Sequence, residues 1–341
     1  MKHLITGGSG FIGNLVARAL HERGEQTAVL DVWEDETRPR EIEFFDCSVL
    51  NRDGVRKAVH GVDIVHHHAA LVAQTNAGRR YWNVNVEGTR IVAEEAARAK
   101  VRAIVHLSST SVYGIPPSGA ITANTPTRPV EPYGRSKLAG EEVMSEICRA
   151  HGIPLITIRP RATLGAGRLG IFQVLFEWVR ENRNVYVIGS GDIKFQLIHA
   201  HDLMEFYLIA LKAGRAGTYN VGTDRFGTLR SELEGLIRYA KSSSRVVSLP
   251  ESLAINVLRL FHFVRLSPLV PWHYLTYHKE CYFDIDPLLK LGWRPRFSNA
   301  EMLQESYDWY CANAATINER GRSAHRSPLR PGVLSLLKRL S

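Results

Sequence analysis

The 341-residue chain has no uninterrupted apolar run of the roughly 18 residues that a membrane-spanning helix needs. None of its four cysteines, Cys47, Cys148, Cys281 and Cys311, belongs to a C-x-x-C pair, which indicates reduced thiols rather than a disulfide framework. The first apolar run starts at residue 3, which leaves no room for a cleavable signal peptide. We therefore expect a cytoplasmic protein that is stabilised by its own core.

The sequence also lacks a basic face across its body, although its net charge is +9. From residue 319 onward there are six arginines and lysines and one glutamate, so the tail alone carries +5. A nucleic-acid-binding domain would instead show basic residues interleaved with aromatics over a folded surface. The composition therefore argues against a nucleic-acid partner and favours a small-molecule substrate.

The basic tail, residues 330–341, interleaves leucines with Lys338 and Arg339. A short amphipathic element of this kind suits an anionic membrane surface, which would make the protein peripheral at the inner face of the membrane. Docking on the protein itself and an unstructured end are the alternatives. The sequence leaves all three interpretations open.

A glycine-rich stretch near the N-terminus is the strongest motif in the chain. It follows a short apolar run and precedes an apolar helical pattern that begins at Phe11, and Asp31 ends the next apolar run. A strand, a tight turn and a helix in this order direct backbone N–H groups at a phosphate, and the later acid suits a ribose hydroxyl. The stretch therefore predicts dinucleotide binding. Its glycines are Gly7, Gly8, Gly10 and Gly13.

Apolar strand-like runs alternate with helical patterns over the first 160 residues. This alternation predicts an α/β protein with a Rossmann-type, doubly wound parallel sheet and a smaller α/β C-terminal region. We expect residues 1–165 to form the dinucleotide-binding domain, with a strand and a helix added from about 195–221. Residues 166–194 and 222–315 would form the substrate-binding region, and residues 316–341 the basic amphipathic tail.

Tyr133 and Lys137 lie four residues apart and therefore on one face of a predicted helix. A lysine beside a tyrosine stabilises the phenolate, so that the tyrosine can exchange a proton near neutral pH. Alone, the pair would be an ordinary surface tyrosine and lysine. However, Ser108, Ser109 and Thr110 end a strand, where a doubly wound sheet binds its ligands. A serine hydroxyl donor, a tyrosine acid/base and a lysine ammonium group together suit hydride transfer from an alcohol.

Taken together, the motifs resemble those of the extended short-chain dehydrogenase/reductases, the group that contains nucleotide-sugar epimerases and dehydratases and the 3β-hydroxysteroid dehydrogenases. The resemblance covers roughly residues 1–310. The motifs that carry it are Thr6–Gly13, Asp31, Asp46, His68–Ala70, Asn85–Thr89, Ser108–Gly114, Tyr133 with Lys137, Arg159–Pro160, Ile198–Asp202 and Asn220–Gly222.

The resemblance implies NAD as the cofactor and assigns residues to its parts. NAD is favoured over NADP because Asp31, with no arginine directly following, would repel a 2′-phosphate. Tyr133 would be the acid/base, Ser109 the catalytic hydroxyl, and Lys137 the partner of both tyrosine and nicotinamide ribose. The implied cofactor residues are Gly7, Gly10, Phe11, Ile12 and Gly13 (pyrophosphate), Asp31 (ribose), Asp46 and Cys47 (adenine), Ala69, Ala70 and Leu71 (centre), Pro160 and Arg161 (nicotinamide), and also Asn85, Ser108, Tyr133 and Lys137.

The substrate positions depart from the sugar-nucleotide pattern. Ala162 and Phe195 stand where many such enzymes have an asparagine and an arginine, and Thr110-Ser111 where dehydratases often have acids. Arg161, Arg168 and Lys194 would either restore the charge or be solvated loop residues. By analogy we rank a nucleotide-sugar epimerase first, a 3β-hydroxysteroid-type or other lipid alcohol dehydrogenase second, and a non-catalytic NAD-binding protein third.

Three further patterns carry weaker expectations. The run His66–His68 cannot converge on one metal ion if it forms a strand, so we expect structural histidines and no metal site. The apolar helical pattern at 251–263 either packs on the body or lines a substrate pocket, and packing is the usual outcome. The family resemblance also implies a homodimer formed through helices near 83–99 and 133–150.

Overall fold

A computed structural model describes residues 1–73, 77–115, 119–122, 124–263 and 271–320. Its largest element is a seven-stranded sheet in which every neighbouring pair of strands is parallel, in the order β11-β7-β5-β4-β1-β2-β3. This confirms the predicted α/β, doubly wound fold class. The strands are β1 (Lys2–Thr6), β2 (Gln26–Asp31), β3 (Glu43–Asp46), β4 (Ile64–His67), β5 (Ala103–Leu107), β7 (Leu155–Pro160) and β11 (Gly217–Val221).

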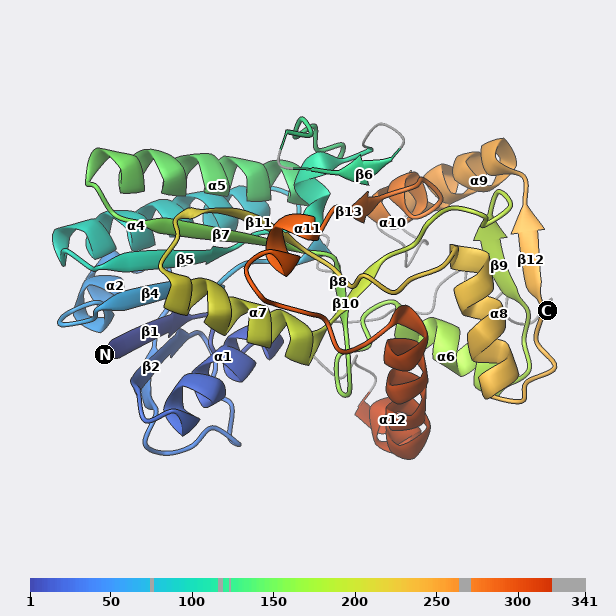
Figure 1. The fold of residues 1–341 in the computed structure, drawn as a ribbon, viewed down its shortest axis with the longest axis horizontal. Helices are drawn as coiled ribbons and strands as arrows, with labels where there is room; N and C mark the ends of the chain where they lie inside the picture. Colours follow the sequence, from blue (N-terminus) through green and yellow to red (C-terminus); the bar gives the residue numbers. More distant parts are fainter. Residues whose placement is uncertain (74–76, 116–118, 123, 264–270, 321–341) are drawn as a thin grey trace.

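Helices cover both faces of this sheet (Figure 1). Its side chains alternate between the two resulting cores. On β1, Ile5 packs toward α1 and α7, whereas Leu4 packs toward α2, α4 and α5. The strand order reverses between β1 and β4, and a doubly wound sheet binds ligands at such a switch point, outside the carboxyl ends of the strands. The helices are α1 (Phe11–Glu22), α2 (Arg52–Ala58), α4 (Gly88–Arg98), α5 (Pro132–Ala150) and α7 (Ala200–Ala213).

The helix expected at 83–99 is divided in the structure. A short α3 (Arg80–Trp82) leads into one π-helical turn, η2 (Asn83–Glu87), before α4 begins. Such turns widen a helix locally and often mark functional sites, because they turn one side chain away from the regular register. Here the buried residue of the turn is Asn85.

The second region combines three two-stranded parallel sheets with several helices, to the right of the main sheet in Figure 1. The pairing of β6 with β13 joins this region to the segment between β5 and α5. The elements are β6 (Ala120–Ile121), β8 (Ala162–Leu164), β9 (Val185–Ile188), β10 (Leu197–His199), β12 (Val246–Leu249), β13 (Tyr282–Phe283), α6 (Phe172–Arg180), α8 (Leu229–Tyr239), α9 (Glu251–Phe263), α10 (Pro271–Thr276), α11 (Asp286–Leu289) and α12 (Asn299–Arg320).

Helix α9 occupies the apolar pattern at 251–263, but it packs less than expected. Ala254 is buried, whereas the large side chains of Leu253, Val257 and Leu260 are exposed. The packing prediction therefore holds for only part of this helix. Among the described residues no helix is both long and apolar enough to cross a membrane. The basic tail at 330–341 lies outside the described residues.

Candidate active site

The turn between β1 and α1 can be built only from small residues. Gly7 has φ of +70°, in the left-handed region, and a Cβ there would lie 2.6 Å from the Ala69 backbone nitrogen. A Cβ on Gly13 would lie 2.3 Å from the carbonyl oxygen of Gly7. The glycines thus let the turn fit closely against the end of β4 and against the first turn of α1.

The N-terminus of α1 is open to an anion. Gly10 caps the helix without any side-chain hydrogen bond, and the first turn contains no acidic residue. The positive end of the helix dipole therefore fits the pyrophosphate of a dinucleotide. The residues assigned to this group, Gly7, Gly10, Phe11, Ile12 and Gly13, all lie on this turn or in the first helical turn.

Asp31 ends β2 beside the glycine turn. Its carboxylate accepts hydrogen bonds from the N–H groups of Ser9 (3.0 Å) and Val32 (2.7 Å). Burial raises the pKa of Asp31, and these hydrogen bonds counteract the rise. Asp46 ends the neighbouring β3, and the Cys47 N–H donates to the Asp31 carbonyl at 2.9 Å. The three residues assigned to ribose and adenine therefore lie at adjacent strand ends.

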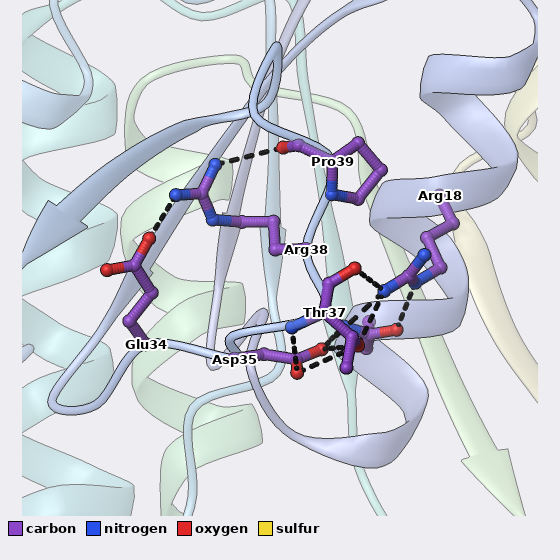
Figure 2. Close-up of polar contacts among 7 residues, drawn as sticks. Arg18, Glu34, Asp35, Thr37, Arg38 and Pro39 are labelled. Atoms are coloured by element: carbon purple, nitrogen blue, oxygen red, sulfur yellow. Dashed lines mark hydrogen bonds and ion pairs between the residues drawn. The ribbon is translucent and has the colours of Figure 1, made fainter.

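The two arginines near the loop after β2, Arg18 and Arg38, interact with residues of that loop (Figure 2). Arg18 of α1 donates to the Thr37 hydroxyl at 2.9 Å. Arg38 donates to the Pro39 carbonyl at 3.1 Å, forms an ion pair with Glu34 and lies over the ring of Phe44. An NADP-specific site needs an arginine available for the 2′-phosphate. Both of these guanidiniums already have protein partners.

Replacing Asp31 with serine is expected to reduce the preference for NAD over NADP. The wild-type carboxylate would repel the extra phosphate, at a cost of about 1–2 kcal/mol when partly solvated. We expect the wild type to bind NAD about 5- to 30-fold more tightly than NADP, and the variant to show a smaller ratio. Titration of both cofactors by calorimetry measures the two ratios. Equal ratios in the two proteins would show that Asp31 does not select the cofactor.

Ser109 and Tyr133 meet at the carboxyl end of β5. The Ser109 hydroxyl forms a hydrogen bond with the Tyr133 side chain, and Ser111 donates to the same serine oxygen at 3.0 Å. Burial nevertheless raises the pKa of Tyr133 to about 12. Ser108 is buried, and its hydroxyl has no hydrogen-bond partner among the described residues. Ser109 is thus the serine that interacts with Tyr133, and its role as the catalytic hydroxyl stays a prediction.

Lys137 lies one helical turn after Tyr133 and is 5% exposed. Its ammonium donates to the Leu107 carbonyl at 2.7 Å. Burial lowers the pKa of Lys137 to about 8, although the Glu141 carboxylate favours the charged form. A lysine held in this way contributes positive charge at the end of β5 while remaining able to exchange its proton.

The low pKa of Lys137 predicts a pH-dependent stability of the cofactor-free protein. Between pH 8 and its ordinary pKa of 10.5, the unfolded chain holds the proton that the folded chain has lost. The contribution of Lys137 to the free energy of unfolding should therefore rise with pH, by up to about 1.4 kcal/mol per pH unit.

Lys137→Met should remove this rise, because methionine fills a similar space without titrating. Urea denaturation of both proteins between pH 8 and 10 makes the comparison. Above pH 10 the raised pKa of Tyr133, about 12, would lower the free energy of unfolding, and the chosen range avoids this effect. Parallel stability curves for the two proteins would contradict the shifted lysine.

Asn85 holds the segment that follows β4. Its side-chain amide accepts from the Leu71 N–H at 2.8 Å and donates to the Leu71 carbonyl at 3.1 Å. It also donates to the Ser136 hydroxyl at 2.9 Å. Asn85 thus fixes the backbone at Ala69, Ala70 and Leu71 relative to α5. Direct contact of these four residues with the cofactor stays a prediction.

Three residues near Tyr133 were not singled out as catalytic partners from the sequence. Glu131 caps α5 by accepting a hydrogen bond from the Tyr133 N–H at 2.7 Å and so fixes the start of the helix that carries Tyr133. The ring of Tyr81 packs 5.9 Å from that of Tyr133. Arg168 lies over Phe11, and its charge acts on the Tyr133 hydroxyl. An acid directly before Pro132 is the one signal that could have revealed Glu131.

Arg161 follows Pro160 at the end of β7 and is 7% exposed. Its guanidinium donates to the Thr110 hydroxyl at 3.1 Å, to the Cys281 sulfur at 2.9 Å and to the Gln196 carbonyl at 3.0 Å. The arginine thus lies beside the segment 108–110 rather than in solvent. The residues that line the adjoining pocket are Thr110, Gly114, Arg161, Phe195, Thr276, Tyr277, Lys279 and Cys281.

The three consecutive histidines point alternately to the two faces of the sheet. His66 and His68 contact Tyr207 of α7, whereas His67 hydrogen-bonds Thr6 and Thr89 on the other side. This agrees with the expectation that they cannot share one ion. In the described ranges, no group of three or more potential ligands could hold a metal.

The fold and these side chains define the class of the protein: an NAD-dependent enzyme of the short-chain dehydrogenase/reductase type. The chain belongs to the NAD dependent epimerase/dehydratase family, whose model matches residues 3–222. This confirms the resemblance, the cofactor and the enzymatic nature that the motifs implied.

Curated relatives extend the match over most of the chain. An uncharacterized protein y4nG of Sinorhizobium fredii is 37% identical, over 98% of this chain and 85% of that protein. UDP-glucose 4-epimerase of Streptomyces lividans is 27% identical, over 94% and 99%. Sterol demethylase protein B of Methylococcus capsulatus is 28% identical, over 69% and 74%. The chain is thus similar both to a sugar-nucleotide enzyme and to a protein named for sterol demethylation.

Solved structures show the same fold. UDP-glucuronic acid 4-epimerase from Bacillus cereus, in complex with NAD, superimposes with a TM-score of 0.75 at 22% identity, over 92% of this chain and 99% of that one. The likeness covers both the main sheet and the second region.

Proposed function

We propose that the chain oxidises a secondary alcohol of a nucleotide sugar to a ketone and then reduces it from the opposite face, which is epimerisation. The observation that carries this proposal is the hydrogen-bonded pair of Ser109 and Tyr133, with Lys137 one turn away at the end of β5. Bound NAD would accept, and in the second half return, the hydrogen of the carbinol carbon.

Each residue of the site has a separate task. The Tyr133 oxygen takes the hydroxyl proton as the carbonyl forms, and Ser109 donates a hydrogen bond to the same substrate oxygen. Tyr133 can do so only as a phenolate, and burial raises its pKa to about 12 although the Ser109 hydroxyl and the charge of Arg168 both lower it. The positive nicotinamide of the oxidised cofactor would favour that phenolate further when it is bound.

The pocket beside Thr110 supports an anionic substrate. Arg161 and Lys279 both line it, and Arg161 is buried with its guanidinium directed at Thr110. Lys279 is paired with Glu251 at 2.7 Å, so Arg161 is the main source of positive charge. Arginine suits a phosphate or carboxylate because its donors form a planar fork. Arg161 would replace the arginine that Phe195 displaces.

A net alcohol dehydrogenase acting on a lipid-like substrate is the second candidate. Phe195, 5% exposed, gives the same pocket an apolar wall where an anion-binding residue was expected. The similarity to sterol demethylase protein B adds weight to this alternative. The chemistry at Tyr133 is the same, but the ketone leaves and the reduced cofactor is released.

One experiment separates the candidates. The protein is incubated with NAD and with panels of UDP- and dTDP-sugars and of hydroxysteroids, and both reduced cofactor and product stereochemistry are followed. Inverted sugar without net NADH supports epimerisation. Net NADH with a steroid, and no reaction with any sugar nucleotide, refutes it in favour of the dehydrogenase.

A further inference from the structure

The guanidinium of Arg168 is a cation to which the described residues offer no anion. It is partly buried, and its central carbon lies 5.5 Å from the centre of the Phe11 ring. Within the described ranges it forms no ion pair and no hydrogen bond. Burial lowers the pKa of Arg168, and the group that opposes this shift is the Tyr133 hydroxyl rather than a carboxylate. A cation placed in this way is costly unless a ligand supplies the missing negative charge.

The neighbouring arginines are already occupied by protein groups. Arg159 donates to both carboxylate oxygens of Glu141, and Arg161 donates to three acceptors around the substrate pocket. The two arginines near the loop after β2 also have partners in that loop. Arg168 therefore differs from each of these four arginines in having its fork of N–H donors available.

A short, well-anchored turn presents Arg168. Gly165 and Arg168 form an isolated antiparallel bridge, and the Arg168 N–H donates to the Gly165 carbonyl at 2.9 Å. Gly167 has φ of +78°, in the left-handed region. A Cβ on Gly165 would lie 3.2 Å from His199 Nε2, and Leu169 is 1% exposed in the core of the second region. The backbone on both sides thus holds the arginine in place without help from an acid.

The ring of Phe11 places this cation at the N-terminus of α1. Phe11 is the first residue of the helix, and Gly10 is its N-cap. Because Cα–Cβ bonds in a helix tilt toward its N-terminus, a ring at the first position stands beside the end of the helix. The guanidinium over that ring adds a full positive charge to the positive end of the helix dipole. The first turn of α1 contains no acidic residue that could balance the two.

We propose that Arg168 binds the pyrophosphate of NAD from the side of the second region, opposite the glycine turn. The inference rests on the assignment of that turn to the pyrophosphate, and it does not depend on epimerisation. The sequence left Arg168 as either a substrate-binding cation or a solvated loop residue. Its contact with Phe11 instead assigns it to the cofactor, which would then link the main sheet to the second region.

Charge balance favours the cofactor over the substrate as the anion. The pyrophosphate of NAD carries two negative charges, and the helix end and the guanidinium together offer about one and a half positive ones. A planar guanidinium can donate two parallel hydrogen bonds to phosphate oxygens. At the substrate pocket the cation is Arg161, and the lining residues of that pocket do not include Arg168.

Arg168→Met tests the contact, because methionine keeps an unbranched side chain over the Phe11 ring and removes the charge. Arg180→Met is the matched control, since Arg180 of α6 lies 5.4 Å from the centre of the Tyr310 ring, on α12. Three ligands are titrated by calorimetry in the absence of substrate. They are NAD, ADP-ribose, which keeps the pyrophosphate but lacks nicotinamide, and adenosine, which has no phosphate.

We expect Arg168→Met to bind NAD and ADP-ribose about 10- to 100-fold more weakly than the wild type, the usual effect of a lost hydrogen bond between charged groups. Adenosine should bind equally well to both proteins. Without cofactor, Arg168→Met should resist urea at least as well as the wild type, because an unpaired cation has left the positive end of a helix. Arg180→Met should match the wild type in all three titrations.

Equal affinities of Arg168→Met and the wild type for NAD and ADP-ribose would overturn the contact. An equal loss for adenosine, or a lower urea midpoint, would overturn it too, because a purely structural arginine predicts both. Weaker binding of a UDP-sugar with unchanged NAD affinity would assign Arg168 to the substrate instead. No titration requires turnover, so a wild type that inverts no sugar nucleotide would refute epimerisation alone, whereas one that binds no NAD would overturn both proposals.

Discussion

Tyr133→Phe is expected to lower kcat by about 10²–10⁴-fold, the usual contribution of a positioned acid/base. Phenylalanine retains the ring that packs against Tyr81, so the local fold should persist. It removes the oxygen that Ser109 hydrogen-bonds and that receives the proton of the substrate. The affinity for NAD should change little, because the glycine turn and Asp31 are untouched.

The loss should be seen in kcat with whichever alcohol the panel identifies, and NAD titration should show that the site is still formed. Tyr239→Phe is the matched control, since its hydroxyl bonds Asp308 at the surface, 2.6 Å away. A Tyr133→Phe protein that kept more than about a tenth of the wild-type rate would refute the assignment of the acid/base.

The main sheet was predictable because its strands are short continuous apolar runs, which is typical of parallel strands buried on both faces. The glycine turn was predictable for a different reason. Only residues without a Cβ fit where Gly13 lies against the Gly7 carbonyl, and this need is visible as a glycine spacing. Both features depend on residues that are close in sequence.

The hydrogen bonds that hold the site in place were not predictable in the same way. Asn85 lies in a π-helical turn and bonds Leu71 and Ser136, which lie 14 and 51 residues away. Strand periodicity correctly separated His66 from His67. However, it could not indicate that Tyr207, 141 residues from His66, would join His66 to His68. Such pairings depend on which helix covers which strand.

For the substrate pocket, individual residues were predictable but their arrangement was not. The sequence identified Arg161 as a possible replacement for a missing cation, and the structure buries its guanidinium against Thr110. The same reasoning placed Phe195 at a position where an arginine is common, and it is in the pocket wall. The sequence could therefore suggest which residues bring charge or apolar surface to the pocket. How the two are balanced within the pocket could be seen only in the three-dimensional arrangement.

Gly13→Ala is expected to destabilise the protein and to impair cofactor binding, although alanine normally favours a helix. Gly13 lies inside α1, where a change from glycine to alanine would ordinarily add about 1 kcal/mol to the free energy of unfolding. Here the new Cβ would lie 2.3 Å from the Gly7 carbonyl and 2.8 Å from the Gly8 Cα. These contacts are backbone atoms that no rotamer change can move. The turn must therefore open.

Opening the turn moves the N–H groups that fit the pyrophosphate, so stability and NAD affinity should fall together. We expect a loss of about 1–3 kcal/mol in the free energy of unfolding, as for other overpacked sites. We also expect at least about tenfold weaker NAD binding. Urea denaturation and cofactor titration measure the two effects.

The control is Gly235→Ala in α8, where the nearest non-neighbouring atom to the new Cβ lies 3.9 Å away. That variant should gain stability, by up to about 1 kcal/mol, and bind NAD as the wild type does. The opposite signs expected for the same substitution in two helices distinguish a steric requirement at Gly13 from helix propensity. If both variants gained stability and bound NAD equally well, the close approach of α1 to the turn would not be what places the cofactor.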